Sequence, residues 1–334
     1  MRRTLAGIAG LTFVLAAGTA AAQQELKFGV FTPAKEVTFE SVMQPFADRV
    51  NADAGGTIKI VTYPNGALSR DPAGQVKLVQ DGVLDMAYVI PSYNPGRFND
   101  IDVFDLPNMI DTAREGSIAA WNLYDKKVMR GFDDFVVIAM LVTPLSQIHT
   151  AKPLNKVDDL KGLKIRTGSA NANLMVQALG ATPVGMPITQ APENISRGVL
   201  DGISTNLAAL FDFRVADVTP NHYMTNLGGV VLSVLMNKKK FDSLPDKAKA
   251  AIMKHRGLVL SQGYLADDVT NANLVKIQAD PRRRVVFPDK ADAAAAQARL
   301  DTVIDAWVKK DPYNAKLLAA LRAEVAAQRG GKKS

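Results

Sequence analysis

The tetrapeptide Gly-Val-Leu-Asp occurs twice in this chain, at 82–85 and at 198–201. The first copy follows a strand pattern at 57–61 and a helical stretch, and the second follows a strand pattern at 163–166 and two helical stretches. Glycine commonly ends a helix because it adopts the left-handed backbone conformation without Cβ strain. The shared placement, between a helix and a strand, predicts two related α/β lobes.

Alternating strands and helices indicate sheets that bind ligands outside their strand ends, where loops and helix N-termini converge. A single larger α/β domain is the alternative, because chance can supply one four-residue repeat. The chain of 334 residues has enough material for either arrangement.

The last third of the chain has mainly helical patterns. Ser243 is predicted to cap a helix that runs to about Lys276, with Gly257 and Gly263 as weak interruptions. Alanine-rich stretches predict two further helices, at 292–305 and 315–328, and residues 330–334 form a frayed tail. Trp121 and Trp307 lie on amphipathic helical patterns, so we expect both in the core.

The first 22 residues have the pattern of a secretory signal peptide. Arg2 and Arg3 precede an apolar run at 5–17, and small residues at 20–22 predict cleavage just before Gln23. A membrane anchor is the alternative, but it requires about twenty apolar residues. We therefore expect a periplasmic protein. It carries no cysteine for lipidation and should diffuse freely.

The chain is basic, with a formal net charge of +7, and part of the excess lies in short runs. These runs are Lys238–Lys240, Arg282–Arg284 and Lys332–Lys333. They lack interleaved aromatic residues, which favours solvated surface over a nucleic-acid interface. A basic bias also helps to attract anionic ligands.

The sequence contains little that indicates catalysis. None of the three histidines, His149, His222 and His255, has a metal-ligand neighbour at helical spacing, and the chain has no cysteine. It also lacks a nucleophile elbow and the glycine patterns that bind phosphate. We expect no enzyme activity, no metal and no cofactor. The alternative is an exported hydrolase whose carboxylate pair is assembled only in the fold.

Short motifs follow one another along nearly the whole mature chain. They are Leu26–Gly29, Tyr63–Leu68, Asp81–Met86, Val157–Arg166, Gly180–Val184, Gly198–Gly202, Asn237–Lys239 and Leu244–Asp246. In this order they resemble the DctP-type solute-binding proteins of TRAP transporters. The most specific of them is the string from Asp159 to Arg166.

The resemblance implies two α/β lobes that share crossing strands and a long spine helix, with a ligand cleft between them that closes by hinge motion. We expect lobe I at 23–145 plus 231–270 and lobe II at 146–230 plus 271–329. The implied partners are a small organic carboxylate and two membrane subunits that accept it, and we expect a monomer. An exported subunit that senses the same solute for a sensor kinase is the alternative.

The resemblance also places the ligand-anchoring arginine of the family at Arg166. A guanidinium group makes two parallel, charge-assisted hydrogen bonds to a carboxylate, which fixes the orientation of the ligand. Arg166 ends a strand and precedes the small residues 167–169, which let a ligand approach the backbone. The alternative is a surface arginine in a salt bridge.

Further cleft positions follow from the same resemblance: Phe31, Arg70, Tyr88, Ile90, Tyr93, Ser146, Asn171, Ile188, Thr205 and Asn206. Two departures from the family pattern bear on the ligand. Residues 189–192 replace a Gly-Glu-x-Tyr string, and Ile90 stands where sugar-acid binders often offer polar groups. These favour a monocarboxylate with an aromatic or alkyl body over a sugar acid. Arg70 would supply a second anionic contact if the ligand is a dicarboxylate.

Overall fold

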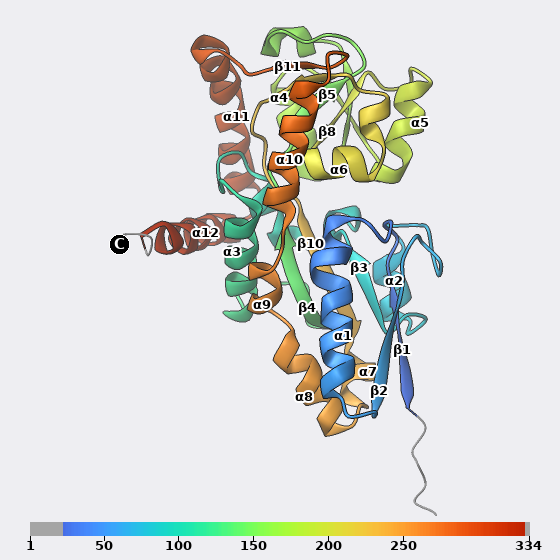
Figure 1. Cartoon of the computed structure of the whole chain (residues 1–334). Helices are drawn as coiled ribbons and strands as arrows, with labels where there is room; N and C mark the ends of the chain where they lie inside the picture. Colours follow the sequence, from blue (N-terminus) through green and yellow to red (C-terminus); the bar gives the residue numbers. More distant parts are fainter. Residues whose placement is uncertain (1–22, 331–334) are drawn as a thin grey trace, which may run out of the picture.

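Two β-sheets, one in each of two lobes, organise the chain (Figure 1). The computed structural model describes residues 23–330. Within them the predicted α/β architecture with two lobes is confirmed. The predicted signal peptide lies outside the described residues, as do the last four residues of the predicted tail.

The sheet of the first lobe has five strands. In spatial order they are β2 (Ile58–Tyr63), β1 (Gln24–Gly29), β3 (Met86–Val89), β10 (Val231–Asn237) and β4 (Phe135–Val142). β1 runs parallel to β2 and β3, whereas β10 runs antiparallel to β3 and β4. Both faces are buried. Successive side chains of β3 therefore enter different cores, Met86 and Tyr88 on one face and Ala87 and Val89 on the other.

The sheet of the second lobe has six strands. In spatial order they are β11 (Arg284–Val286), β9 (Asn221–Tyr223), β5 (Gln147–Thr150), β8 (Gly202–Thr205), β6 (Lys164–Thr167) and β7 (Thr182–Gly185). β6 runs parallel to β7 and β8, so the carboxyl ends of these strands lie at one edge of the sheet. Arg166 and Thr205 are both at that edge, which faces the first lobe.

The chain crosses between the two sheets from β4 to β5 and again from β9 to β10. The two crossing segments are hydrogen-bonded to each other. The amide of Thr143 donates to Val230 at 2.9 Å, and that of Leu227 donates to Ser146 at 2.9 Å. The predicted crossing strands are therefore present, and they form a paired connection beneath the space between the lobes.

The repeated Gly-Val-Leu-Asp has the same structure in both lobes. Gly82 follows α2 (Gln75–Gln80) with φ +73°, and Gly198 follows α5 (Ala191–Ser196) with φ +71°. The aspartate of each copy then binds a lysine backbone in the neighbouring strand. Asp85 accepts from the Lys27 amide at 2.8 Å, and Asp201 accepts from the Lys164 amide at 2.9 Å. In each copy the glycine thus ends a helix, and the aspartate binds the backbone of the neighbouring strand, a contact called the clamp below.

The prediction of one helix from Ser243 to about Lys276 is wrong, because this segment forms separate helices. They are α8 (Asp246–His255), α9 (Leu258–Gln262) and α10 (Ala266–Ala279). Gly257 has φ +86°, and a Cβ there would overlap the ring of Trp121. The Ser243 hydroxyl donates to the Lys240 carbonyl at 2.7 Å at the end of α7 (Lys238–Asp242), so it caps no following helix. α10 continues to the second lobe, where it packs on α6 (Leu207–Asp212) (Figure 1).

Helices cover the sheets on their outer faces. α1 (Gln44–Asp53) packs on β2 and α8, and α3 (Ala113–Asp125) packs on β4 and α9. In the second lobe α4 (Ala170–Ala178) packs on β7 and on α11 (Lys290–Lys310). Trp121 on α3 and Trp307 on α11 are buried, as predicted.

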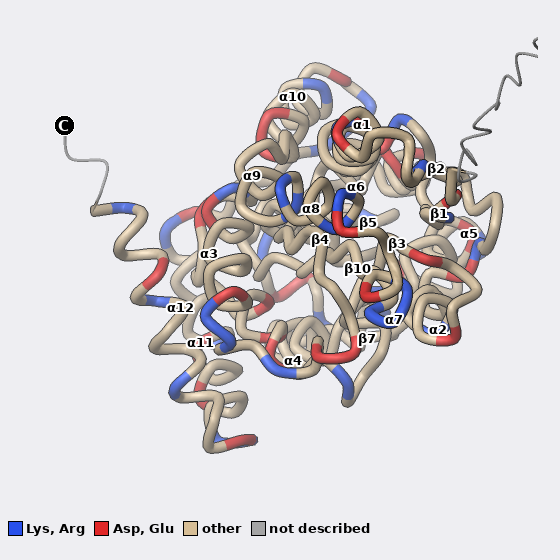
Figure 2. Tube along the Cα trace, turned by 90° about the horizontal axis from the view of Figure 1, so that it is seen from below, with Lys and Arg blue, Asp and Glu red and all other residues tan. Residues whose placement is uncertain are grey.

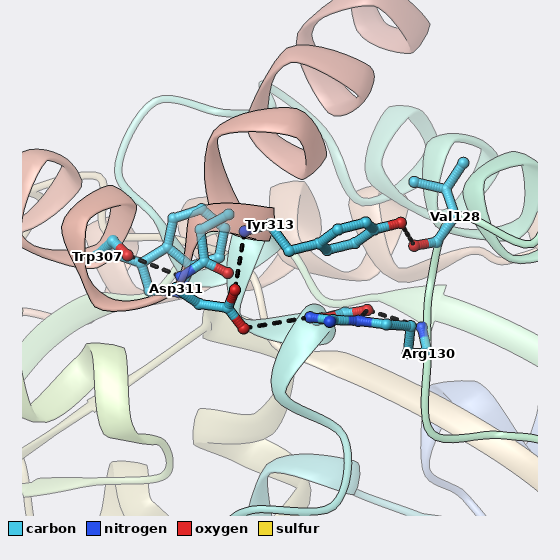
Figure 3. Close-up of polar contacts among 7 residues, drawn as sticks. Val128, Arg130, Trp307, Asp311 and Tyr313 are labelled. Carbon is cyan, nitrogen blue, oxygen red and sulfur yellow. Dashed lines mark hydrogen bonds and ion pairs between the residues drawn. The ribbon is translucent and has the colours of Figure 1, made fainter.

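The last helix, α12 (Pro312–Gly330), packs on α3 of the first lobe. Figure 3 shows its polar anchor: the guanidinium of Arg130 lies 4.0 Å from the Tyr313 ring centroid, and the Tyr313 hydroxyl donates to the Val128 carbonyl at 2.8 Å. The lobe boundaries given above remain a proposal. This packing favours a boundary near Asp311, with α12 counted in the first lobe.

The basic runs form local ion pairs in the described part of the chain. Lys238 pairs with Asp242 and Lys240 with Asp85. Figure 2 shows Lys and Arg interspersed with Asp and Glu over the helices seen in that view. No helix among residues 23–330 has the length and apolarity needed to cross a bilayer.

Candidate ligand-binding site

A cavity lies between the lobes, with about 770 Å³ of empty space including its opening to solvent. The strand ends and loops of both sheets line it. All the predicted site residues line it except Arg70 and Asn171: Phe31, Tyr88, Ile90, Tyr93, Ser146, Arg166, Ile188, Thr205 and Asn206. These residues are far apart in the sequence, and the fold brings them together in one enclosed space.

The structure places Arg70 and Asn171 outside this lining. Arg70 is exposed in the loop after β2. Asn171 is buried on α4, where its side-chain amide donates to the Asp102 carbonyl of the first lobe at 2.8 Å. Asn171 thus ties the lobes together behind the cavity.

Arg166 is 4% exposed at the end of β6. Its Nε donates to the Met186 carbonyl at 2.8 Å, and its Nη2 donates to the Tyr93 hydroxyl at 2.8 Å. It has no ion pair within residues 23–330, so the alternative of a surface salt bridge is wrong. A buried guanidinium without a carboxylate partner is costly, because its charge has lost water without gaining a counter-charge. The site is therefore suited to an anion.

Tyr93 adds a second donor to the arginine. Its hydroxyl oxygen accepts from Arg166 Nη2 and from the Ile188 amide at 3.1 Å. Both lone pairs of this oxygen are then occupied, and the hydroxyl proton remains to be donated. Tyr93 lines the cavity. An anionic oxygen in the cavity could therefore accept from the guanidinium and from this hydroxyl together.

The walls beyond the arginine are largely apolar. The rings of Phe31 and Tyr88 are stacked, with centroids 5.2 Å apart and planes 5° from parallel. Ile90 and Ile188 contribute aliphatic surface to the same cavity. Such walls favour a ligand body that is flat or hydrocarbon in nature.

Polar groups interrupt these walls at the end of β8. Asn206 caps α6, since its Oδ1 accepts from the Ala209 amide at 3.0 Å, and its side-chain NH₂ makes no hydrogen bond with another described residue. Ser204 is buried, lines the cavity and has no hydrogen-bond partner for its hydroxyl in the described chain. Sequence reasoning missed Ser204, because alternation along β8 places its side chain on the opposite face from that of Thr205.

A group of acidic and phenolic residues lines the cavity as well: Glu36, Asp212, Tyr88 and Tyr264. Of these, only Tyr88 was predicted from the sequence. Burial raises the pKa of Glu36, although Thr38 and Phe39 donate hydrogen bonds that oppose this effect. Burial and then the charges of Glu36 and Glu40 raise the pKa of Asp212 to about 7. The carboxylates come from different lobes, so no local sequence pattern could have paired them.

Direct hydrogen bonds join the lobes beside Arg166. The Ser92 hydroxyl donates to the Gly168 carbonyl at 3.0 Å, and the Ser169 hydroxyl donates to the carboxyl group of Asp105. Burial raises the pKa of Asp105 to about 7. With the Tyr93 bonds, these contacts show that the lobes are closed around the cavity.

A buried histidine pair lies behind Thr205. The Nδ1 atoms of His149 and His222 are 2.9 Å apart, and His149 Nε2 lies 3.2 Å from the Thr205 carbonyl. A carbonyl only accepts, so His149 donates from Nε2, and His222 donates from Nδ1 to His149. Burial is the main cause that lowers the pKa of both rings, that of His222 to about 4. No group of three or more potential metal-ligating side chains occurs among the residues described.

Two α/β lobes are joined by crossing strands, and a partly apolar cavity lies between them. Among the described residues, a single arginine without an ion pair lies in the cavity wall. These features define a two-lobed solute-binding protein. Residues 28–311 match the family model DctP, bacterial extracellular solute-binding protein, family 7. The chain belongs to this family. Its members are transport proteins that bind a substrate.

Solved structures of TRAP solute-binding proteins share this fold. One from a marine metagenome, specific for aromatic acid ligands and in complex with metahydroxyphenylacetate, is 28% identical with TM-score 0.86, covering 91% of this chain and 99% of that one. One from Rhodoferax ferrireducens with copurified benzoate is 28% identical with TM-score 0.84, covering 92% and 98%. One from Bordetella bronchiseptica with bound mandelate is 25% identical with TM-score 0.83, covering 91% and 99%.

Proposed function

We propose that this protein is the periplasmic solute-binding component of a TRAP transporter and captures a small monocarboxylate with an aromatic or alkyl body. One observation carries the proposal: Arg166 is buried in the wall of the inter-lobe cavity and has no carboxylate partner among the described residues. The ligand carboxylate would accept from this guanidinium and from the Tyr93 hydroxyl. It would supply the counter-charge that the protein lacks there.

The apolar walls support the proposed ligand body. Phe31 and Tyr88 offer aromatic surface, and Ile90 and Ile188 offer aliphatic surface. A sugar acid would bury hydroxyl groups against these side chains and leave those that face them unpaired, which is unfavourable. The similar structures with metahydroxyphenylacetate, benzoate and mandelate agree with an aromatic acid.

In this proposal the protein is exported, remains a monomer and delivers its ligand to the TRAP membrane subunits. Opening would separate the lobe contacts at Ser92, Tyr93 and Ser169, and the paired crossing segments would serve as the hinge. The protein itself performs no chemistry on the ligand, so recovered ligand should be unaltered after prolonged incubation.

Mass spectrometry of small molecules that remain bound through purification would identify the ligand directly. A thermal-shift panel would then compare aromatic and short-chain acids with uronates and sialic acid. A ligand at one hundred times its Kd should add about 2.7 kcal/mol to the free energy of unfolding. Stabilisation by uronates or sialic acid, with none by the simpler acids, would overturn the proposed ligand class.

The role of Arg166 is tested by calorimetry on Arg166→Ala, with Arg197→Ala as control because Arg197 is an exposed arginine of the same lobe. We expect Arg166→Ala to abolish measurable carboxylate binding while the circular dichroism spectrum of the folded protein is retained, and Arg197→Ala to bind normally. Unchanged affinity in Arg166→Ala would refute the anchor.

A further inference from the structure

The acidic group in the cavity contains one carboxylate whose hydrogen bonds are satisfied and one whose hydrogen bonds are not. Glu36 Oε1 accepts from the Thr38 amide at 2.9 Å and from the Thr38 hydroxyl at 2.6 Å. Its Oε2 accepts from the Phe39 amide at 3.1 Å and from the Thr32 hydroxyl at 3.4 Å. Four donors from its own loop thus surround Glu36, and it has little capacity left for a ligand.

One of the two phenols beside Glu36, Tyr88, also has a hydrogen-bond partner within the protein. Thr38 gives its proton to Glu36, so the Tyr88 hydroxyl, 3.5 Å away, is the donor in its contact with Thr38. The proton of Tyr88 therefore points toward Thr38 and away from a ligand. Tyr264 is buried and lines the same cavity.

Asp212 differs from all of these groups. It is half-buried at the end of α6 and lines the cavity, yet its carboxylate has no hydrogen bond or ion pair with another residue of the described chain. Ala208 lies one turn earlier on α6 and lines the same cavity, so this face of the helix is turned toward the ligand space. A ligand that fills the cavity would remove water from this carboxylate, so a ligand without a hydrogen-bond donor there would leave it unpaired, which is unfavourable.

Asp212 lies at the end of α6 away from β8, the strand that pairs with the strand of Arg166, and Arg166 is not among the charges that act on Asp212. Asn206, next to the end of β8, and Asp212 stand at opposite ends of α6, six residues apart, which corresponds to about 9 Å of helix. The charges that act on Asp212 are those of Glu36 and Glu40. Ser204, which is 6% exposed and has no partner for its hydroxyl in the described chain, lines the same cavity and is a second sign of an incomplete hydrogen-bonding surface.

We propose that Asp212 is a specificity-determining residue that accepts a hydrogen bond from a hydroxyl or amino substituent at the end of the ligand remote from its carboxylate. The inference rests on the proposed function, since Arg166 must hold the carboxylate for the substituent to reach α6. The preferred ligand is then an aromatic or alkyl acid with a distal hydrogen-bond donor. A plain hydrocarbon acid would leave Asp212 unsatisfied and bind more weakly.

The experiment measures dissociation constants by calorimetry for matched acids: benzoate against 3- and 4-hydroxybenzoate, and phenylacetate against its 3- and 4-hydroxy and 4-amino derivatives. Methoxy analogues keep the oxygen and remove the donor. We expect at least one hydroxy or amino acid to bind about tenfold or more tightly than its parent, and its methoxy analogue to lose that gain. The variant Asp212→Ala should bring the ratio to within about twofold of one.

Asp217→Ala is the matched control, because Asp217 is an exposed carboxylate just beyond α6 that pairs with Arg214. It should keep the wild-type ratio. Equal binding of parent and substituted acids by the wild type overturns the inference and leaves the proposed function standing, as does a preference that persists in Asp212→Ala. The comparison with methoxy analogues needs no variant, and equal binding of the hydroxy and methoxy acids overturns the inference even if Asp212→Ala does not fold. Failure of every acid to bind would overturn the proposed function and this inference with it.

Discussion

The hydroxyl oxygen of Tyr93, in the first lobe, lies 2.8 Å from Nη2 of Arg166, in the second. The proposed anion anchor in one lobe is thus hydrogen-bonded to a phenol of the other. Because the same oxygen also accepts from the Ile188 amide, its proton is directed away from both donors. Arg166 therefore reaches this arrangement only when the lobes are closed, which in the proposed function would couple closure to ligand capture.

Tyr93→Phe should weaken ligand binding about tenfold, equivalent to about 1.4 kcal/mol, because it removes one donor to the carboxylate and one bond between the lobes. Calorimetry with the ligand identified by mass spectrometry is the measurement. Tyr63→Phe is the control, since the Tyr63 hydroxyl binds the exposed Glu25 far from the cavity. Equal affinity of Tyr93→Phe and wild type would show that the hydroxyl contributes nothing to capture.

The preference for an acid with a distal donor should increase with pH. The pKa of Asp212 is raised to about 7, so its carboxylate is mostly ionised at pH 8 and mostly protonated at pH 6. An ionised acceptor forms the stronger hydrogen bond. Glu36 and Glu40 act on Asp212, and Tyr88 and Tyr264 lie beside it with pKa values raised by burial.

Because those neighbours can titrate too, the comparison with Asp212→Ala is essential. The ratio of the two dissociation constants, substituted over parent acid, should fall several-fold from pH 6 to pH 8 in the wild type. In Asp212→Ala it should stay level. A pH effect of equal size in both proteins would assign it to Glu36 or another group.

The histidine pair should stay neutral in the folded protein well below the usual pH for imidazole protonation. Burial lowers both pKa values, that of His222 to about 4, whereas the unfolded chain takes up these protons near pH 6.5. This pair therefore contributes stability above about pH 6.5 that is lost as pH falls toward 4. Nitrogen-15 NMR should show His149 protonated at Nε2 and His222 at Nδ1, unchanged from pH 7.5 to 5.5.

The same spectra in denaturant supply the reference, since both rings should then titrate normally. Protonation of either ring in the folded protein between pH 5.5 and 7 would contradict this account. So would the opposite tautomers, because His149 could then make no hydrogen bond to the Thr205 carbonyl.

Gly257→Ala should destabilise the fold by about 3 kcal/mol or more, through a left-handed backbone and a clash with Trp121. Gly96→Ala is the matched control. Gly96 has φ +85°, and a Cβ there meets nothing within 4 Å. We expect a loss of about 1 kcal/mol there. Denaturant unfolding measures both changes, and equal losses would show that contact with Trp121 carries no cost.

Most of the structural features that depend on local sequence pattern were predicted correctly. The strand ending at Arg166, the glycine stops at Gly82 and Gly198, and the buried tryptophans all follow from periodicity or backbone preference. The helix from Ser243 failed because the break at Gly257 depends on the ring of Trp121, which approaches from a distant helix. A glycine in a helical pattern does not reveal what will pack against it.

The site was predictable only in part for a similar reason. Arg166 and the cleft positions that surround it follow from the resemblance to a family. Asp212 and Glu36 do not, because each looks like an ordinary solvated acid in its own segment. Only the closure of one lobe on the other places them in one cavity.

The duplicated Gly-Val-Leu-Asp has a consequence for folding. In each lobe the glycine and the aspartate connect a helix end to a strand of the same sheet, through Asp85 and Lys27 in one and Asp201 and Lys164 in the other. Neither clamp involves the opposite lobe. Damage to one clamp should therefore be confined to its own lobe, and losses from damaging both should be additive. Each lobe is therefore stabilised by contacts of its own, so its internal structure does not depend on contact with the other lobe.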